Sequence, residues 1–124
     1  MTVTIADIEA AADVIAGDVV RTPTVAAPGL SREAGCEIYL KLESLQLTGS
    51  FKARGARNRL GVIDPATSRG VIACSAGNHA QGVAYFAERM GIAATIVMPR
   101  ETPFAKVTRT ERYGARVILE GDSF

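Results

Sequence analysis

The chain has 124 residues, of which 48% are hydrophobic, and its 14 basic and 13 acidic residues leave a formal net charge of +1. A chain of this length can bury about two-thirds of its unfolded surface, so one compact unit is feasible. Scattered charges and the lack of an apolar run of about 20 residues predict neither a nucleic-acid partner nor a membrane partner. Cys36, Cys74 and the single His79 match no metal-ligand spacing and the amino terminus does not resemble a signal peptide, so we expect a cytoplasmic protein without a metal site.

The first part of the chain predicts a helix, an irregular stretch and one strand. Thr4 is a typical N-cap for a helix with apolar residues at helical spacing, and Gly17 is placed to end it. Turns rich in proline and glycine follow, and residues 31–34 are expected to form a short helical turn. Alternation of apolar and polar residues then predicts a strand over 37–43.

The second part predicts helices that alternate with short apolar strands. The expected elements are a helix over 51–60, a strand over 70–75, a helix over 78–90, a strand over 93–98, a helix from Pro103 to Tyr113 and a strand over 115–119. Such alternation is typical of βαβ units and a parallel sheet. The predicted fold class is therefore α/β with a βαβαβ unit, and the last residues, 121–124, look like the cap of a further helix, so the fold is expected to be incomplete there.

A lysine, Lys52, lies in the first turn of the helix expected at 51–60, within the segment from Thr48 to Gly55. The positive end of a helix dipole disfavours an ammonium group there, which makes a neutral, nucleophilic amine easier to form and suits Schiff-base chemistry. The alternative is a solvated lysine at a helix start, and residue type and spacing alone favour that alternative.

The segment from Ser75 to Gly82 joins a predicted strand to the helix that follows it. Backbone N–H groups at such a point, together with a hydroxyl, an amide and a glycine, can bind a carboxylate or phosphate. The alternative is that Ser75 and Asn78 only cap the helix. A local contact is expected for His79 rather than acid–base catalysis, and a structural pairing with Lys41 or an arginine is expected for Glu43.

These segments resemble the threonine and serine dehydratases, which are pyridoxal-phosphate (PLP) enzymes of the tryptophan synthase β fold, also called fold type II. Residues 41–56 resemble the segment that ends in the cofactor lysine of that family, 75–82 resemble its asparagine loop, and 94–115 supply a third match. Cysteine and threonine synthases usually have an aspartate where Ala53 stands and a threonine where His79 stands. Serine racemases usually have a serine where Ala76 stands, so this alanine favours elimination over racemisation.

The resemblance implies a PLP site and a dehydratase activity. Lys52 would bind the cofactor and take the α-proton of the substrate, Asn78 would hydrogen-bond the ring hydroxyl, and Phe51 would lie against the ring. The substrate carboxylate would be bound by Ser75, Ala76, Gly77, Asn78 and His79. L-Threonine or L-serine would be dehydrated and deaminated to 2-oxobutanoate or pyruvate and ammonia.

The resemblance also implies a division of the chain. Residues 1–36 would form a helix and arm of the larger domain of the family, and 37–124 the cofactor-lysine segment and most of the small α/β domain. The glycine-rich loop that binds the PLP phosphate in the family has no counterpart in these residues. We therefore expect a truncated or split form that is inactive alone and needs a complementary chain. The alternatives are a non-catalytic α/β module and a serine racemase-like enzyme. Open strand edges predict association or a homo-oligomer.

Overall fold

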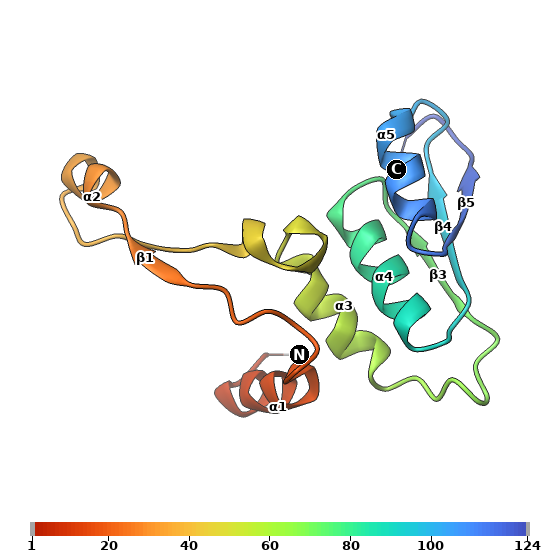
Figure 1. Cartoon of the computed structure of the whole chain (residues 1–124), viewed down its shortest axis with the longest axis horizontal. Coiled ribbons are helices and arrows are strands. Elements are labelled where there is room, and N and C mark those ends of the chain that lie inside the picture. The colour runs from red at the N-terminus through yellow and green to blue at the C-terminus, as the bar shows by residue number, and fades with distance from the viewer. Residues whose placement is uncertain (1, 124) are drawn as a thin grey trace.

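The computed structural model describes residues 2–123, which form an α/β unit and an amino-terminal part with a projecting arm (Figure 1). In chain order the elements are α1 (Ile5–Ile15), β1 (Thr24–Ala26), α2 (Pro28–Ala34), β2 (Tyr39–Lys41), the 3-10 turns η1 (Glu43–Leu45) and η2 (Leu47–Gly49), α3 (Lys52–Leu60), β3 (Val71–Cys74), α4 (Asn78–Arg89), β4 (Ala94–Met98), α5 (Phe104–Glu111) and β5 (Arg116–Leu119).

The α/β unit contains a parallel sheet with the strand order β3-β4-β5. Val71 of β3 is paired with Ala94 of β4, and Thr95 of β4 with Arg116 of β5. Helices α4 and α5 pack against the sheet, and α3 packs against α4 (Figure 1). The predicted βαβαβ unit and its parallel sheet are confirmed, because α4 connects β3 to β4 and α5 connects β4 to β5, and both strand pairs are parallel.

Small side chains allow α3 and α4 to approach each other closely. Ala53 and Ala56 of α3 are almost completely buried. Gly82 of α4 lies directly opposite them: a Cβ atom at this position would be 3.3 Å from the Ala56 Cβ and 3.3 Å from the Lys52 carbonyl oxygen. The contact therefore holds the backbone of Lys52 against α4. Around it, the largest fully buried side chains are Phe86, Ile96, Met98 and Thr110.

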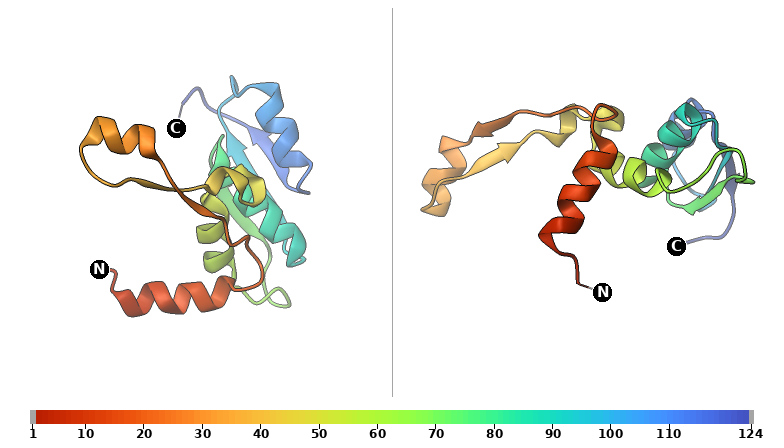
Figure 2. Two further views of the ribbon diagram at one scale, coloured as in Figure 1. Left: turned by 60° about the vertical axis from the view of Figure 1, so that its left-hand side comes forward. Right: turned by 90° about the horizontal axis from the view of Figure 1, so that it is seen from below.

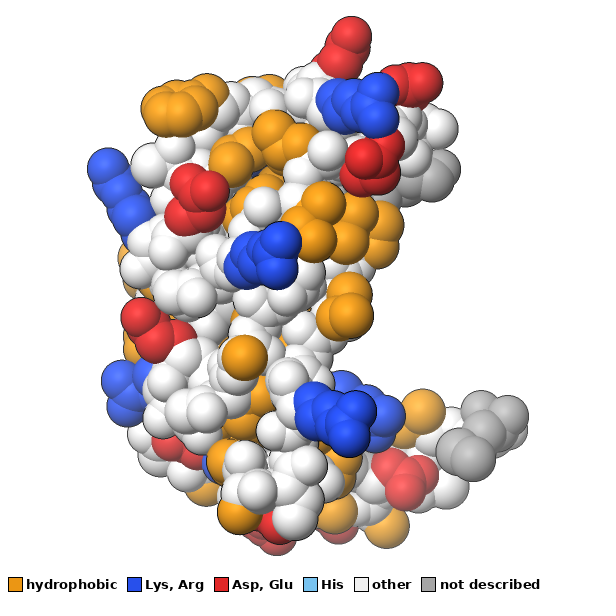
Figure 3. Space-filling view, turned by 90° about the vertical axis from the view of Figure 1, so that its right-hand side faces the viewer, with side chains coloured by type: hydrophobic (Ala, Val, Ile, Leu, Met, Phe, Trp, Pro, Cys, Tyr) orange, Lys and Arg blue, Asp and Glu red, His pale blue; other side chains and the backbone are white. Residues whose placement is uncertain are grey.

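One side of β3 is open to solvent. Its residues alternate between half-buried and exposed, and Ile72 is 79% exposed. A space-filling view from the side of the sheet shows hydrophobic side chains gathered between charged ones (Figure 3). The strand is thus apolar on both faces, as predicted, but the described helices cover only one of them.

The arm is an antiparallel pair of short strands with α2 at its tip, and it projects away from the α/β unit (Figure 2). Thr24 of β1 is paired with Lys41 of β2. At the tip, the Ser31 hydroxyl donates to the Ala27 carbonyl oxygen and accepts from the Ile38 N–H. The boundary proposed between residues 36 and 37 falls between these paired strands, and the division into two domains stays a prediction.

Several predicted boundaries differ from the structure by a few residues. The strand predicted over 37–43 is wrong at both ends, because β2 has only the three residues of β1 as a partner and the chain turns into η1 after Leu42. Pro103 is the N-cap of α5 rather than its first residue, since its φ and ψ of −54° and 133° are not helical. In addition, α2 begins at Pro28 rather than at 31 and α3 at Lys52 rather than at 51. Helices α4 and α5 end at Arg89 and Glu111, before the predicted ends, and β3, β4 and β5 are shorter than predicted by one residue or two.

The prediction for the first helix is confirmed in detail. Thr4 is the N-cap of α1 and forms a capping box with Asp7, which lowers the pKa of that carboxyl through hydrogen bonds from Thr4. Gly17 follows the helix with a φ of +79°. Within residues 2–123, no helix is long and apolar enough to span a membrane.

Candidate functional site

The chain reaches Lys52 through a strained turn. Thr48 has a φ of 63° and Gly49 a φ of 74°, so two successive residues have a left-handed conformation. Such a φ is an outlier for a β-branched residue, and backbone strain of this kind clusters at functional sites. The next residue, Ser50, is buried, and its hydroxyl accepts a hydrogen bond from the Lys52 N–H at 3.2 Å. The turn therefore fixes the direction in which α3 begins.

The side chain of Lys52 is exposed and lies beside an aromatic ring. Its amino nitrogen is 4.9 Å from the centre of the Phe51 ring, which is itself 58% exposed. Within the described chain, no acidic side chain forms an ion pair with Lys52. The amine is thus accessible to a ligand, with a flat apolar surface next to it.

An ion pair between Glu43 and Arg54 anchors the helix that carries Lys52. The Arg54 guanidinium donates to both Glu43 carboxylate oxygens, at 2.7 and 2.8 Å, and the Thr22 hydroxyl donates to one of them at 2.5 Å. Hydrogen bonds from Arg54 are the main reason why the pKa of Glu43 falls from its ordinary value of 4.5 to about 2, although partial burial opposes the change. The pairing expected for Glu43 is therefore made with an arginine, while the Lys41 amine donates to the Thr22 carbonyl oxygen.

Two further contacts hold the segment after α1 against the same region. The Gln46 amide accepts from the Val20 N–H at 2.9 Å and donates to the Val20 carbonyl oxygen at 2.8 Å, as a neighbouring strand would. Arg57 of α3 donates to Asp18 at 2.6 Å. Gln46 is buried, so its contacts are shielded from water, whereas the ion pair joins a mostly buried Arg57 to an Asp18 side chain that is 38% exposed. The position of Lys52 thus depends on residues far from it in the sequence.

The Ser75–Gly77 turn follows β3 and leads into α4. Gly77 is the N-cap of α4, and no side chain caps the helix. The Ser75 hydroxyl instead accepts from the Gly77 N–H at 3.3 Å, and Asn78 is the first helical residue. The alternative in which Ser75 and Asn78 only cap the helix is therefore wrong. The first N–H groups of an α-helix have no partner within the helix, so the start of α4 can donate to an anion.

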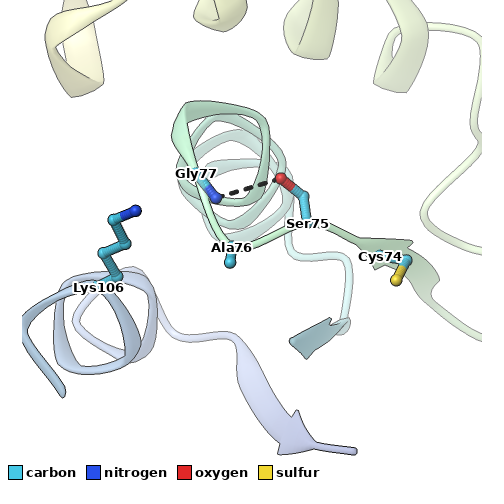
Figure 4. Close-up of a pocket in the computed structure, with 5 residues that line it drawn as sticks. All are labelled: Cys74, Ser75, Ala76, Gly77 and Lys106. Atoms are coloured by element: carbon cyan, nitrogen blue, oxygen red, sulfur yellow. Dashed lines mark hydrogen bonds between the residues drawn. The ribbon is translucent and has the colours of Figure 1, made fainter. Parts of the chain in front are cut away.

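A hollow of about 360 Å³ opens beside this turn (Figure 4). It is lined by Cys74, Ser75, Ala76, Gly77 and, from α5, Lys106. Ala76 presents a methyl group to the hollow. Three consecutive residues predicted to bind substrate, Ser75, Ala76 and Gly77, thus line one hollow, and the structure brings Lys106 to them.

The other predicted site residues are placed differently. Asn78 is exposed at the start of α4. The His79 side chain lines a second hollow, between α3 and β3, with apolar residues that include Leu60 and Ile72. His79 is the second residue of α4, so its backbone N–H belongs to the first turn of the helix. Lys52 is joined to this region through the close contact between its carbonyl group and Gly82.

Sequence reasoning missed Gln46, Arg54 and Lys106. The first two are parts of the anchoring contacts, and a buried glutamine pairing with a distant backbone leaves no local pattern. Lys106 had a signal: it follows β4, and the carboxyl ends of neighbouring parallel strands lie at one edge of a sheet, where ligands bind. The loop after β4 and the first turn of α5 were therefore a second place to look for polar side chains.

Known proteins are similar to the chain over nearly its whole length. The model of the family described as "Pyridoxal-phosphate dependent enzyme" matches residues 15–124. An L-threonine ammonia-lyase of Thermotoga maritima is 51% identical over 98% of this chain and 31% of its own length, and a catabolic L-threonine dehydratase, TdcB, of Staphylococcus aureus is 48% identical over 98% and 36%. The chain spans about a third of the length of these curated relatives.

Solved structures also match the chain over nearly its whole length. A serine racemase from maize matches 100% of this chain with 38% of its own, at a TM-score of 0.91 and 37% identity. The processed threonine deaminase isoform 2 of Solanum lycopersicum matches 96% of this chain with 32% of its own, at a TM-score of 0.81 and 38% identity.

Proposed function

We propose that this chain, which belongs to the family of pyridoxal-phosphate dependent enzymes, is part of a threonine ammonia-lyase. It is the part that carries the cofactor lysine and the loop that binds the substrate carboxylate. The observation that carries the proposal is the placement of Lys52. It is exposed, has no acidic partner within the described residues, and begins a helix packed directly against the helix that follows the Ser75–Gly77 turn. The two curated relatives described above act, by their names, on L-threonine.

The residues present fit a PLP cofactor. A free lysine amine lies beside the exposed Phe51 ring, on which a pyridine ring can stack. The Thr48 hydroxyl, in the turn before Lys52, is buried without a hydrogen-bond partner, so a polar ligand at this turn would satisfy it. Asn78 has an amide group free of cap hydrogen bonds. Lys52, Phe51 and Asn78 are therefore the proposed cofactor-binding residues.

The chain's own residues would bind and orient the amino acid. When bound, PLP withdraws electrons from the α-carbon of an amino acid and so makes its proton acidic. The Lys52 amine would accept that proton. Ser75, Gly77 and the N–H groups of Asn78 and His79 would bind the substrate carboxylate at the start of α4. L-Threonine would lose its β-hydroxyl as water and, after hydrolysis, yield 2-oxobutanoate and ammonia. L-Serine would yield pyruvate.

Ala76 favours elimination over racemisation. Racemisation needs an acid–base group on each face of the α-carbon, and the residue at this position of the hollow presents a methyl group, which cannot exchange a proton. We therefore prefer the ammonia-lyase to a serine racemase-like activity, although serine racemases are among the similar structures.

Turnover is proposed for the assembled site rather than for these residues alone. The phosphate-binding loop of the family has no counterpart in the chain, and we propose that a complementary part of the polypeptide or a partner chain supplies it. The exposed face around Ile72 supports association, including a homo-oligomer.

The experiment is the addition of PLP to the purified chain. We expect a visible absorbance band of lysine-bound PLP, which disappears in Lys52→Arg. This substitution keeps the charge but cannot form the covalent bond. Lys41→Arg is the matched control and should keep the band. The absence of a band in the natural chain, or an equal band in Lys52→Arg, would refute a cofactor role for Lys52 in the isolated chain and favour the non-catalytic alternative.

A further inference from the structure

We propose that Lys106 is an additional substrate-binding residue, whose ammonium group binds the carboxylate of the amino acid opposite the Ser75–Gly77 turn. The inference rests on the proposed function, and it adds a residue from α5 to the site. Lys106 lines the same hollow as Ser75, Ala76 and Gly77. Figure 4 shows its side chain rising from α5 with the amino nitrogen at the end nearest to Gly77.

The backbone of Lys106 is held firmly in place. Its N–H donates to the Pro103 carbonyl oxygen at 2.8 Å, and its own carbonyl oxygen accepts from the Thr110 hydroxyl at 2.9 Å. Thr110 is only 1% exposed, so this second contact ties Lys106 to the core between α4 and α5. The side chain therefore starts from a fixed point beside the hollow and can reach a ligand within it.

The charge of Lys106 is not balanced within the described chain. The ion pairs there join Arg54 to Glu43, Arg57 to Asp18 and Arg100 to Glu120, and the Lys106 amine has no hydrogen-bond partner among these residues. Across the hollow lie a hydroxyl, a glycine and the unpaired start of α4, which attract an anion rather than another cation. An anion in the hollow would accept hydrogen bonds both from the Lys106 amine and from the N–H groups at the start of α4.

A second cation shows that this face of α5 borders the site. Arg109 lies one turn after Lys106, and its Nη2 atom is 3.9 Å from the position of a Cβ atom on Gly49, in the strained turn before Lys52. Residues three apart lie on the same face of a helix. Helix α5 thus approaches both segments of the proposed site, and Lys106 is the cation beside the carboxylate loop.

The test follows the backbone N–H signals of Gly77, Asn78 and His79 by NMR while the ¹⁵N-labelled chain is titrated. The ligands are L-threonine, L-threoninol, which lacks the carboxylate, and inorganic phosphate. We expect saturable shifts with L-threonine and none with L-threoninol. Lys106→Gln should weaken L-threonine binding about five- to tenfold, as expected for the loss of one charge-assisted hydrogen bond near the surface, and Lys106→Arg should largely preserve it. Arg112→Gln removes the same charge from the end of α5 and should leave binding unchanged.

The inference is overturned if Lys106→Gln binds L-threonine as tightly as the natural chain, if L-threoninol binds equally well, or if the natural chain does not bind L-threonine. Shifts with phosphate alone would overturn it as well, because they would assign the cation to a phosphate group. The proposed function fails separately: PLP capture that is unchanged in Lys52→Arg refutes the role of Lys52 but does not affect a carboxylate contact of Lys106.

Discussion

Replacing Glu43 with glutamine tests how firmly the segment before Lys52 is tied to α3. The substitution keeps the shape and one acceptor for Thr22 but removes the charge that binds Arg54. The pKa of Glu43 falls from 4.5 to about 2 in the folded chain. At about 1.4 kcal/mol per pKa unit, this sets a ceiling of about 3 kcal/mol. The paired side chains are 18% and 28% exposed, so we expect solvent screening to leave about 1–2 kcal/mol.

The pH dependence follows from the direction of this shift. A carboxyl whose pKa is depressed by folding stabilises the fold fully above its unfolded value, near 4.5, and loses that contribution as the pH falls towards 2. The difference in unfolding free energy between the natural chain and Glu43→Gln should therefore shrink by more than half between pH 6 and pH 3.

Urea unfolding followed by circular dichroism at the two pH values measures this difference. Glu120→Gln is the matched control, since its ion pair with Arg100 is more than 60% exposed on both sides and should contribute less than about 0.5 kcal/mol. Equal effects of Glu43→Gln and Glu120→Gln at pH 6, or a difference that stays constant down to pH 3, would refute the anchoring role of the ion pair.

Two further predictions concern the packing of α3 and the open face of the sheet. Gly82→Ala should destabilise the chain by about 1–3 kcal/mol in thermal unfolding and reduce PLP capture at Lys52, because the added methyl group pushes α3 away from α4. Gly55→Ala is the control: its added methyl group meets no atom within 4 Å, so it should be neutral or stabilising. A Gly82→Ala variant as stable as Gly55→Ala contradicts this. Ile72→Glu should reduce self-association in sedimentation velocity, and Val62→Glu, at a similarly exposed loop residue, should not. A natural chain that sediments as a monomer contradicts the second prediction.

Local sequence patterns predicted the α/β part well because each of its elements is specified locally. The capping box at Thr4 and the apolar strands separated by helices that end near a glycine are short-range signals. The turn at Ser75 was predicted for the same reason, since the strand before it and the helix after it are both specified locally, while its role in binding a substrate stays a prediction. Strand lengths were less predictable, because β2 is limited by the length of its partner β1.

The parts of the site that sequence did not predict depend on contacts between distant segments. The left-handed conformation of Thr48 is imposed by its surroundings, since threonine does not favour it. The approach of Lys106 to Ser75 arises from the order of β3 and β4 in the sheet, and the orientation of His79 towards α3 arises from the packing of two helices. Residue type and spacing alone do not specify either arrangement, although the position of Lys106 soon after a predicted parallel strand indicated the edge of the sheet on which it lies.

Reduction of the PLP complex with borohydride, followed by peptide mass spectrometry, tests the central claim most directly. The lysines of the chain are Lys41, Lys52 and Lys106, so the modified residue can be assigned without ambiguity. We predict that the phosphopyridoxyl group is found on Lys52 at one equivalent of PLP, with little on the other two. Modification that is spread over all three lysines, or concentrated on Lys41 or Lys106, would contradict the assignment of Lys52 as the cofactor lysine.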